Sequence, residues 1–147
     1  MDPTGFWKLI SSIDADALEE GDEESAVESL VAKLAKLDDG DLQTFDEQLA
    51  RVLYDLDTRA HADAAGDSGK SADGFLYARC FVVASGQKTY ERVLGNPREM
   101  PKNDEWCEAL LGVAAQAWAQ RTGNDEADWT FDASVSYETG SNAAKWR

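Results

Sequence analysis

The stretch SADGFLYARCFVVA, residues 71–84, decides the fold class. Its apolar side chains occupy most sides of a helix rather than one stripe. A helix that is apolar around most of its circumference is usually enclosed by other helices. Ser71 is a favoured N-cap residue, and Asp73 places a negative charge in the first turn, where the helix dipole is positive. The stretch therefore predicts the central helix of a mainly α-helical domain.

Other helices are expected around this one because apolar residues recur at helical spacing elsewhere. They cover residues 3–13, 22–37, 41–56, 87–94 and 103–121. The acidic stretch Asp14–Glu24, which carries Gly21, is expected to be a linker. The third helix should fray around His61–Ala65, and Gly66–Lys70 has the composition of a flexible loop.

The C-terminal part follows a different pattern. From Trp129 to Tyr137, apolar and polar residues alternate, which is the period of an extended chain. No second run of this kind could pair with it. We therefore predict a compact, mainly α bundle of about six helices, with an extended C-terminal segment, or a short edge strand, packed over it. Residues 1–147 are expected to form a single domain.

The charge is strongly negative and unevenly distributed. The net charge is −15, and residues 1–57 contain sixteen acidic and only four basic residues. Such a chain is unsuited to nucleic acid, whose phosphates require clustered lysine and arginine, and to an anionic membrane surface. Two explanations remain open: an ordinary solvated surface, or a surface that meets a basic partner protein.

Targeting and redox signals point to a cytoplasmic protein. No apolar run approaches the roughly 20 residues of a membrane span, and Met1–Thr4 lacks the basic region of a signal peptide. Cys80 and Cys107 both lie within apolar helical patterns. We expect them to be reduced thiols in the core rather than a disulfide.

One loop resembles a phosphate-binding motif only superficially. The run Ala64–Ser71, AAGDSGKS, has Ala64 where the motif needs its first glycine. The preceding residues are polar and helix-like, whereas the motif follows a buried strand. We therefore interpret it as a helix-to-helix connection and expect no nucleotide.

Catalytic and metal sites are poorly supported. His61 is the only histidine, and its position beside the expected loop suggests solvent exposure. One histidine and two distant cysteines do not form a zinc set, and the carboxylates lack the spacing of a calcium loop. We predict no cofactor and no metal, and no catalytic residue can be named.

Arg79 and the aromatic residues near the tail are the candidate binding residues. Because Arg79 lies in the most apolar helix, it should need a carboxylate partner, such as Asp73, Glu138 or an N-terminal acid. The alternative is an anion-binding arginine in a cleft. Trp129 and Trp146 flank the tail and could anchor it or serve as interface contacts. The candidate set is Asp73, Arg79, Tyr137, Glu138, Trp129 and Trp146.

Three separated blocks of the chain form a recognisable set. They are the opening FWKLI (6–10), the run SADGFLYAR (71–79) followed by Gly86, Tyr90-Glu91, Val93-Leu94 and Asn96-Pro97, and the ending YETGSN (137–142) with Trp146. Together they resemble a known bacterial family, the domain of unknown function 4240. The ending is similar to that of actinobacterial members. Many members carry a tryptophan- and glycine-rich region before the second block, which this chain lacks. The resemblance implies a stand-alone cytoplasmic helical domain and brings no activity.

Two functions are compatible with these observations. The first is an interaction module that presents an acidic face to a basic partner, with an immunity or antitoxin-like inhibitor as its most specific form; that form rests on analogy with other small acidic bacterial domains. The second is a small-molecule binder or enzyme with a cleft between the central helix and the tail, where Asp73, Arg79, Tyr137 and Glu138 would converge. The sequence does not indicate an oligomeric state.

Overall fold

The computed structural model describes all 147 residues and contains eight α-helices and no β-strand. Six helices have eight or more residues: α1 (Pro3–Ile10), α3 (Glu23–Leu34), α4 (Asp39–Asp55), α6 (Ala72–Ala84), α7 (Gln87–Gly95) and α8 (Val113–Thr122). The other two are short: α2 (Ala15–Glu19) and α5 (Arg59–Ala64). The predicted mainly α fold is confirmed.

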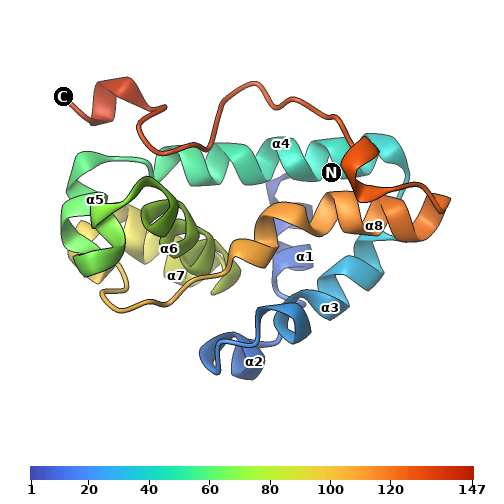
Figure 1. The fold of residues 1–147 in the computed structure, drawn as a ribbon, viewed down its shortest axis with the longest axis horizontal. Helices are drawn as coiled ribbons and strands as arrows, with labels where there is room; N and C mark the ends of the chain where they lie inside the picture. Colours follow the sequence, from blue (N-terminus) through green and yellow to red (C-terminus); the bar gives the residue numbers. More distant parts are fainter.

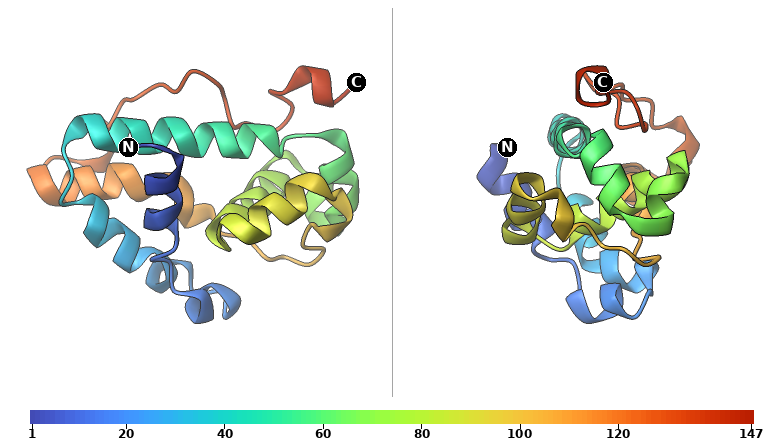
Figure 2. Two further views of the ribbon diagram at one scale, coloured as in Figure 1. Left: turned by 180° about the vertical axis from the view of Figure 1, so that it is seen from behind. Right: turned by 90° about the vertical axis from the view of Figure 1, so that its left-hand side faces the viewer.

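The longest helix, α4, lies along the long axis of the molecule (Figure 1). Helices α5, α6 and α7 gather at one end of it, while α3 and α8 pack against each other towards the other end. The C-terminal segment runs along the outer side of α4, as the views from behind and from the end also show (Figure 2). None of the helices has the length and apolar character that crossing a bilayer requires.

Helix α6 is the buried central helix that the sequence predicts. Nine of its thirteen residues are buried, and the Ser71 side chain caps it by accepting a hydrogen bond from the Gly74 N–H. Cys80 and Cys107 are buried free thiols, as expected. Burial raises the pKa of Cys107 to about 12 and that of Cys80 further still, so both thiols are neutral.

The expectation of a linker at Asp14–Glu24 is wrong, because this stretch contains α2. The Asp14 carboxylate caps the helix by accepting hydrogen bonds from the N–H groups of Asp16 and Ala17. Ala17 and Leu18 are buried against the core. A short helix therefore forms here because its cap and its two apolar residues act together, although its surface is acidic.

The chain after α4 does not fray. Thr58 starts the separate helix α5 by accepting a hydrogen bond from the His61 N–H. His61 is 4% exposed, so the prediction of a solvent-exposed histidine is wrong.

The helix expected from residue 103 begins only at Val113, after a 3₁₀ turn at Glu108–Gly112. The Cys107 N–H donates to the Tyr77 carbonyl instead, and the Ala109 N–H donates to Glu23 Oε1 at 2.9 Å. These N–H groups therefore donate to acceptors on α6 and α3. In a helix that began at residue 103, they would donate to carbonyls of the helix itself.

The Gly66–Lys70 segment is a 3₁₀ turn packed closely on its neighbours, not a loose loop. A Cβ at Gly69 would lie 1.9 Å from the Ala62 carbonyl oxygen, which belongs to the backbone of α5.

We expect Gly69→Ala to lower the free energy of unfolding by about 3 kcal/mol, the upper range for overpacking. Gly112→Ala is the matched control, because nothing lies within 4 Å of its added Cβ. Chemical denaturation of both variants tests this, and equal stabilities would contradict it.

Candidate functional site

The C-terminal segment supplies most of the candidate residues. Between Trp129 and Tyr137 the odd-numbered residues are half-buried and the even-numbered residues are exposed. This alternation confirms the extended segment, although no strand forms. We call residues 129–138 the strap.

Asp57 anchors the chain beyond the strap. It is fully buried after the end of α4, and its carboxylate accepts three hydrogen bonds. Oδ1 accepts from the Gly140 N–H at 3.0 Å and from Trp146 Nε1 at 2.8 Å, and Oδ2 accepts from the Asn142 N–H at 3.0 Å. A buried carboxylate needs such donors to offset its lost hydration. Asp57 thereby fixes the end of the chain to the helical body.

Arg79 holds the same part of the tail from α6. It is fully buried, and its two terminal nitrogens donate to the Leu53 carbonyl at 2.9 Å and to Thr139 Oγ1 at 3.1 Å. Its guanidinium lies over the Phe75 ring, 4.7 Å from the centroid, and Nε has no partner. Burial lowers the pKa of Arg79, and the negative charge of Asp57 opposes this shift.

We refer to Asp57, Arg79, Thr139, Asn142 and Trp146 as the tail latch. Arg79 forms no ion pair within 4.0 Å of any carboxylate, so neither Asp73 nor Glu138 is the partner that the sequence suggested. Asp73 lies six residues before Arg79, so the two side chains leave the helix on different sides. The carboxylate whose charge acts most strongly on Arg79 is Asp57.

A cavity of about 480 Å³ lies between the strap and α4. Its apolar walls come from the strap residues Trp129, Phe131 and Tyr137 and from Leu49 and Ala50 of α4. Its acidic residues are Asp46, Asp132 and Glu138. We call this space the strap cavity.

Asp46 is the most perturbed acid of the strap cavity. The Trp129 indole N–H donates to its Oδ2 at 2.8 Å, and the Trp129 ring in turn packs 5.7 Å from that of Trp118. Burial raises the pKa of Asp46 to about 6, and the Trp129 hydrogen bond only partly offsets this effect. A carboxyl group that titrates near neutral pH is typical of functional sites, although structural sites also contain such groups.

The neighbouring Glu47 has the opposite environment, at the outer edge of the strap. It accepts hydrogen bonds from the Ser134 hydroxyl and N–H and from Arg51 Nε. The Ser134 bonds and Arg51 lower the pKa of Glu47 to about 2. Glu47 thus serves to fasten the strap, whereas Asp46 faces the cavity.

The raised pKa of Asp46 predicts a pH-dependent stability difference. Since its pKa is higher folded than unfolded, the folded state binds the proton more tightly, and stability falls as pH rises from about 4 to about 6. Asp46→Asn, which keeps an acceptor for Trp129, should therefore match the wild type near pH 4 and exceed its stability by about 2–3 kcal/mol at pH 7. Urea denaturation at both pH values measures this. A difference independent of pH would contradict it.

Both ring nitrogens of His61 form hydrogen bonds within the chain. Nε2 donates to the Val93 carbonyl at 2.8 Å, which leaves Nδ1 to accept from the Thr58 hydroxyl at 2.6 Å. Burial lowers the pKa of His61, which favours this neutral form. No three histidine, cysteine, aspartate or glutamate side chains converge as a metal-binding group would.

The predicted candidate residues divide into three places. Arg79 and Trp146 belong to the tail latch, and Trp129, Tyr137 and Glu138 line the strap cavity. Asp73 is exposed at the start of α6 and belongs to neither. The alternative hypothesis required one cleft lined by Asp73, Arg79, Tyr137 and Glu138. The structure does not bring these four residues together in this way. Sequence reasoning missed Asp46 and Asp57.

The comparisons with known proteins identify a family but no activity. No curated protein and no solved structure matches the chain. The model of the family described as "Protein of unknown function (DUF4240)" matches residues 1–121. The match contains α1 to α7, most of α8, and both Asp57 and Arg79, and it ends before the strap. On this match, the chain belongs to the DUF4240 family of proteins of unknown function.

Proposed function

We propose that this protein is an interaction module that binds a basic segment of a partner protein. The proposed binding surface is the acidic face, on the side opposite the strap. It consists of exposed acids of α2, α3 and the chain before the 3₁₀ turn at Glu108–Gly112: Asp16, Glu19, Glu20, Glu24, Glu28, Asp104 and Glu105.

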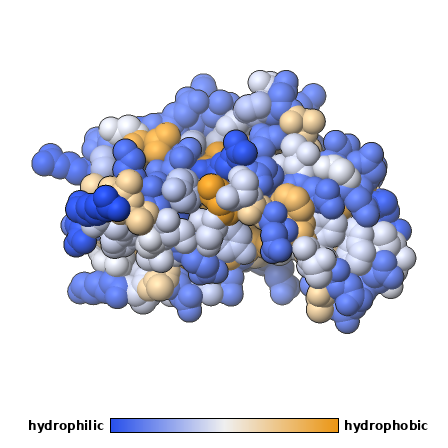
Figure 3. Space-filling view, turned by 90° about the horizontal axis from the view of Figure 1, so that it is seen from above, coloured by the Kyte–Doolittle hydropathy of each residue, from blue (hydrophilic) through white to orange (hydrophobic).

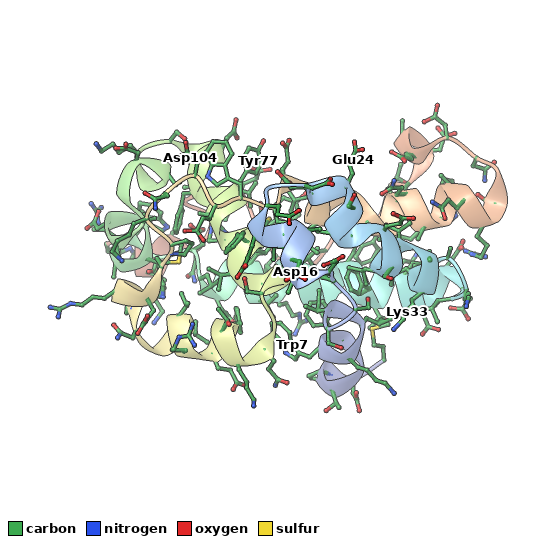
Figure 4. All side chains as sticks on the ribbon, turned by 90° about the horizontal axis from the view of Figure 1, so that it is seen from below. Trp7, Asp16, Glu24, Lys33, Tyr77 and Asp104 are labelled. Atoms are coloured by element: carbon green, nitrogen blue, oxygen red, sulfur yellow. The ribbon has the colours of Figure 1, made fainter.

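The observation that carries the proposal is that these acids come together from separate segments around aromatic rings. Glu19 and Glu105 line one hollow with Trp106. Trp106 and Tyr77 are half-buried and pack edge to face, 5.7 Å apart. Figure 4 views this side and labels Asp16, Glu24, Tyr77 and Asp104. None of the acids forms an ion pair within the chain.

A basic partner is favoured by this composition. Complementary charge accelerates encounter and excludes acidic competitors, while half-buried aromatic residues provide the contacts that hold a complex. The most specific form of the proposal is an immunity or antitoxin-like inhibitor of a basic protein. An electrostatic complex should weaken roughly tenfold when NaCl rises from 50 to 300 mM.

The test compares two variants with equal loss of charge. Glu19→Gln/Glu24→Gln/Glu105→Gln removes three of the seven negative charges of the acidic face. Asp63→Asn/Glu91→Gln/Glu99→Gln removes three exposed charges from α5, α7 and the 3₁₀ turn at Pro97–Glu99. Each is used as bait in lysate of the source organism, with mass-spectrometric identification. We expect the wild type and the second variant to retain basic proteins, and 300 mM NaCl to release them. The first variant should retain none of these proteins. Equal retention by both variants would overturn the proposal.

A further inference from the structure

The strap cavity combines aromatic walls with carboxylates that have no cationic partner. One side is formed by the rings of Trp129, Phe131 and Tyr137, and α4 contributes Leu49 and Ala50. Figure 3 looks down on this side of the molecule and shows hydrophobic patches framed by hydrophilic residues. The cavity can therefore hold an alkyl chain and a polar group at the same time.

The carboxylates of this cavity keep acceptor oxygens that no group of the chain occupies. Trp129 occupies Oδ2 of Asp46, but Oδ1 accepts no hydrogen bond within the chain. Asp132 and Glu138 take part in none of the three ion pairs of the structure. No lysine or arginine lines the cavity. Glu47 lies just outside the cavity and differs from these acids, because its carboxylate pairs with Arg51 and accepts a hydrogen bond from the Ser134 hydroxyl.

These features select the chemistry of a ligand. An anion would be repelled by three carboxylates. A calcium or magnesium ion needs six or more oxygen ligands, whereas much of this cavity is apolar. An organic cation satisfies both parts, since a carboxylate pairs with its charge and aromatic faces attract it.

We propose that the strap cavity binds a guanidinium or primary ammonium group carried on a short alkyl chain. The Asp46 carboxylate pairs with the charged group, Glu138 and Asp132 add to the negative potential, and the rings of Trp129 and Tyr137 enclose the cation and its alkyl chain. This site is on the side of the molecule opposite the acidic face (Figures 3 and 4) and does not depend on the function proposed for that face.

Trp129 provides a direct reporter of occupancy. Its indole N–H donates to Asp46, so a cation that pairs with this carboxylate shifts the indole resonance in a ¹H–¹⁵N spectrum. The resonance is assigned with Trp129→Phe. We expect butylguanidinium to shift it saturably, and neutral butylurea, of nearly the same shape, to leave it unchanged.

Two variants with the same charge change separate pairing from bulk electrostatics. Asp46→Asn should weaken butylguanidinium binding at least fivefold, while Asp63→Asn, on the exposed surface of α5, should stay within a factor of two. Glu138→Gln, an exposed residue at the cavity edge, gives a second measurement should Asp46→Asn alter folding. Equal affinities in Asp46→Asn and Asp63→Asn, a linear response without saturation, or an equal shift by butylurea would each overturn the proposal.

The same titration distinguishes the two sources of such a group. A capped pentapeptide with a central arginine between alanines tests an arginine side chain of another protein, and butylguanidinium tests a free metabolite. Binding of the peptide with equal or higher affinity assigns the site to a protein side chain. Binding of the free cation alone assigns it to a small molecule, and binding of neither overturns the proposal.

Discussion

Replacing Asp57 with alanine is expected to release the end of the chain from the helical body and to lower the free energy of unfolding by about 4 kcal/mol. The substitution removes the acceptor of three hydrogen bonds, from Gly140, Asn142 and Trp146. It also leaves the fully buried Arg79 without the negative charge that acts most strongly on it. Removing one member of a buried charged network typically costs about 3–5 kcal/mol.

Hydrogen exchange and urea denaturation measure the two parts of this prediction. Amides 139–147 should lose protection, while those of α4 and α6 keep it below the unfolding transition. Asp55→Ala is the control, because Asp55 is exposed two residues away and carries the same charge. A loss of stability as small as that of the control, or a tail that keeps its protection, would contradict the role of Asp57.

The main helices could be predicted because their signals are local. The capping serine Ser71 and the apolar circumference of α6 lie within one stretch of sequence, and so do the cap Asp22 and the apolar stripe of α3. Helix α2 could not be predicted in this way. Its burial rests on two residues, Ala17 and Leu18, which is too little for a periodic signal.

The start of α8 shows a second limit of sequence reasoning. The apolar spacing of residues 103–112 fits a helix, but the backbone of this region bonds to Tyr77 and Glu23, far away in sequence. Tertiary hydrogen bonds of this kind override local preference, and no pattern within the segment indicates them.

The candidate site was only partly predictable for the same reason. The alternation in residues 129–137 indicated which strap side chains face inward, including Trp129 and Tyr137. Asp46 and Asp57 are two of sixteen acids within residues 1–57, and nothing in their neighbours distinguishes them. Their roles arise from the tail that folds back over α4, a placement that depends on the whole tertiary structure.

Asp57 and Arg79 are also expected to depend energetically on each other. Asp57→Asn leaves the buried Arg79 guanidinium without the opposite charge that acts most strongly on it. Arg79→Met likewise leaves the buried Asp57 carboxylate without an opposite charge, and it removes the donor to the Leu53 carbonyl. We expect each substitution to cost about 3 kcal/mol. The double variant should cost little more than one alone, since it removes both buried charges together, so the coupling energy should reach about 2 kcal/mol.

Urea denaturation of the four proteins at pH 7 gives the coupling energy directly. Arg79→Lys completes the comparison, because it keeps the charge but loses the planar fork that reaches both the Leu53 carbonyl and Thr139 Oγ1. Arg79→Lys should therefore be less stable than the wild type. Its coupling energy with Asp57→Asn should be smaller than that of Arg79→Met, because the positive charge remains. Additive costs, within about 0.5 kcal/mol, would mean that Asp57 holds the tail through its hydrogen bonds alone. The Arg79 charge would then be stabilised by Phe75 and the carbonyl of Leu53 instead.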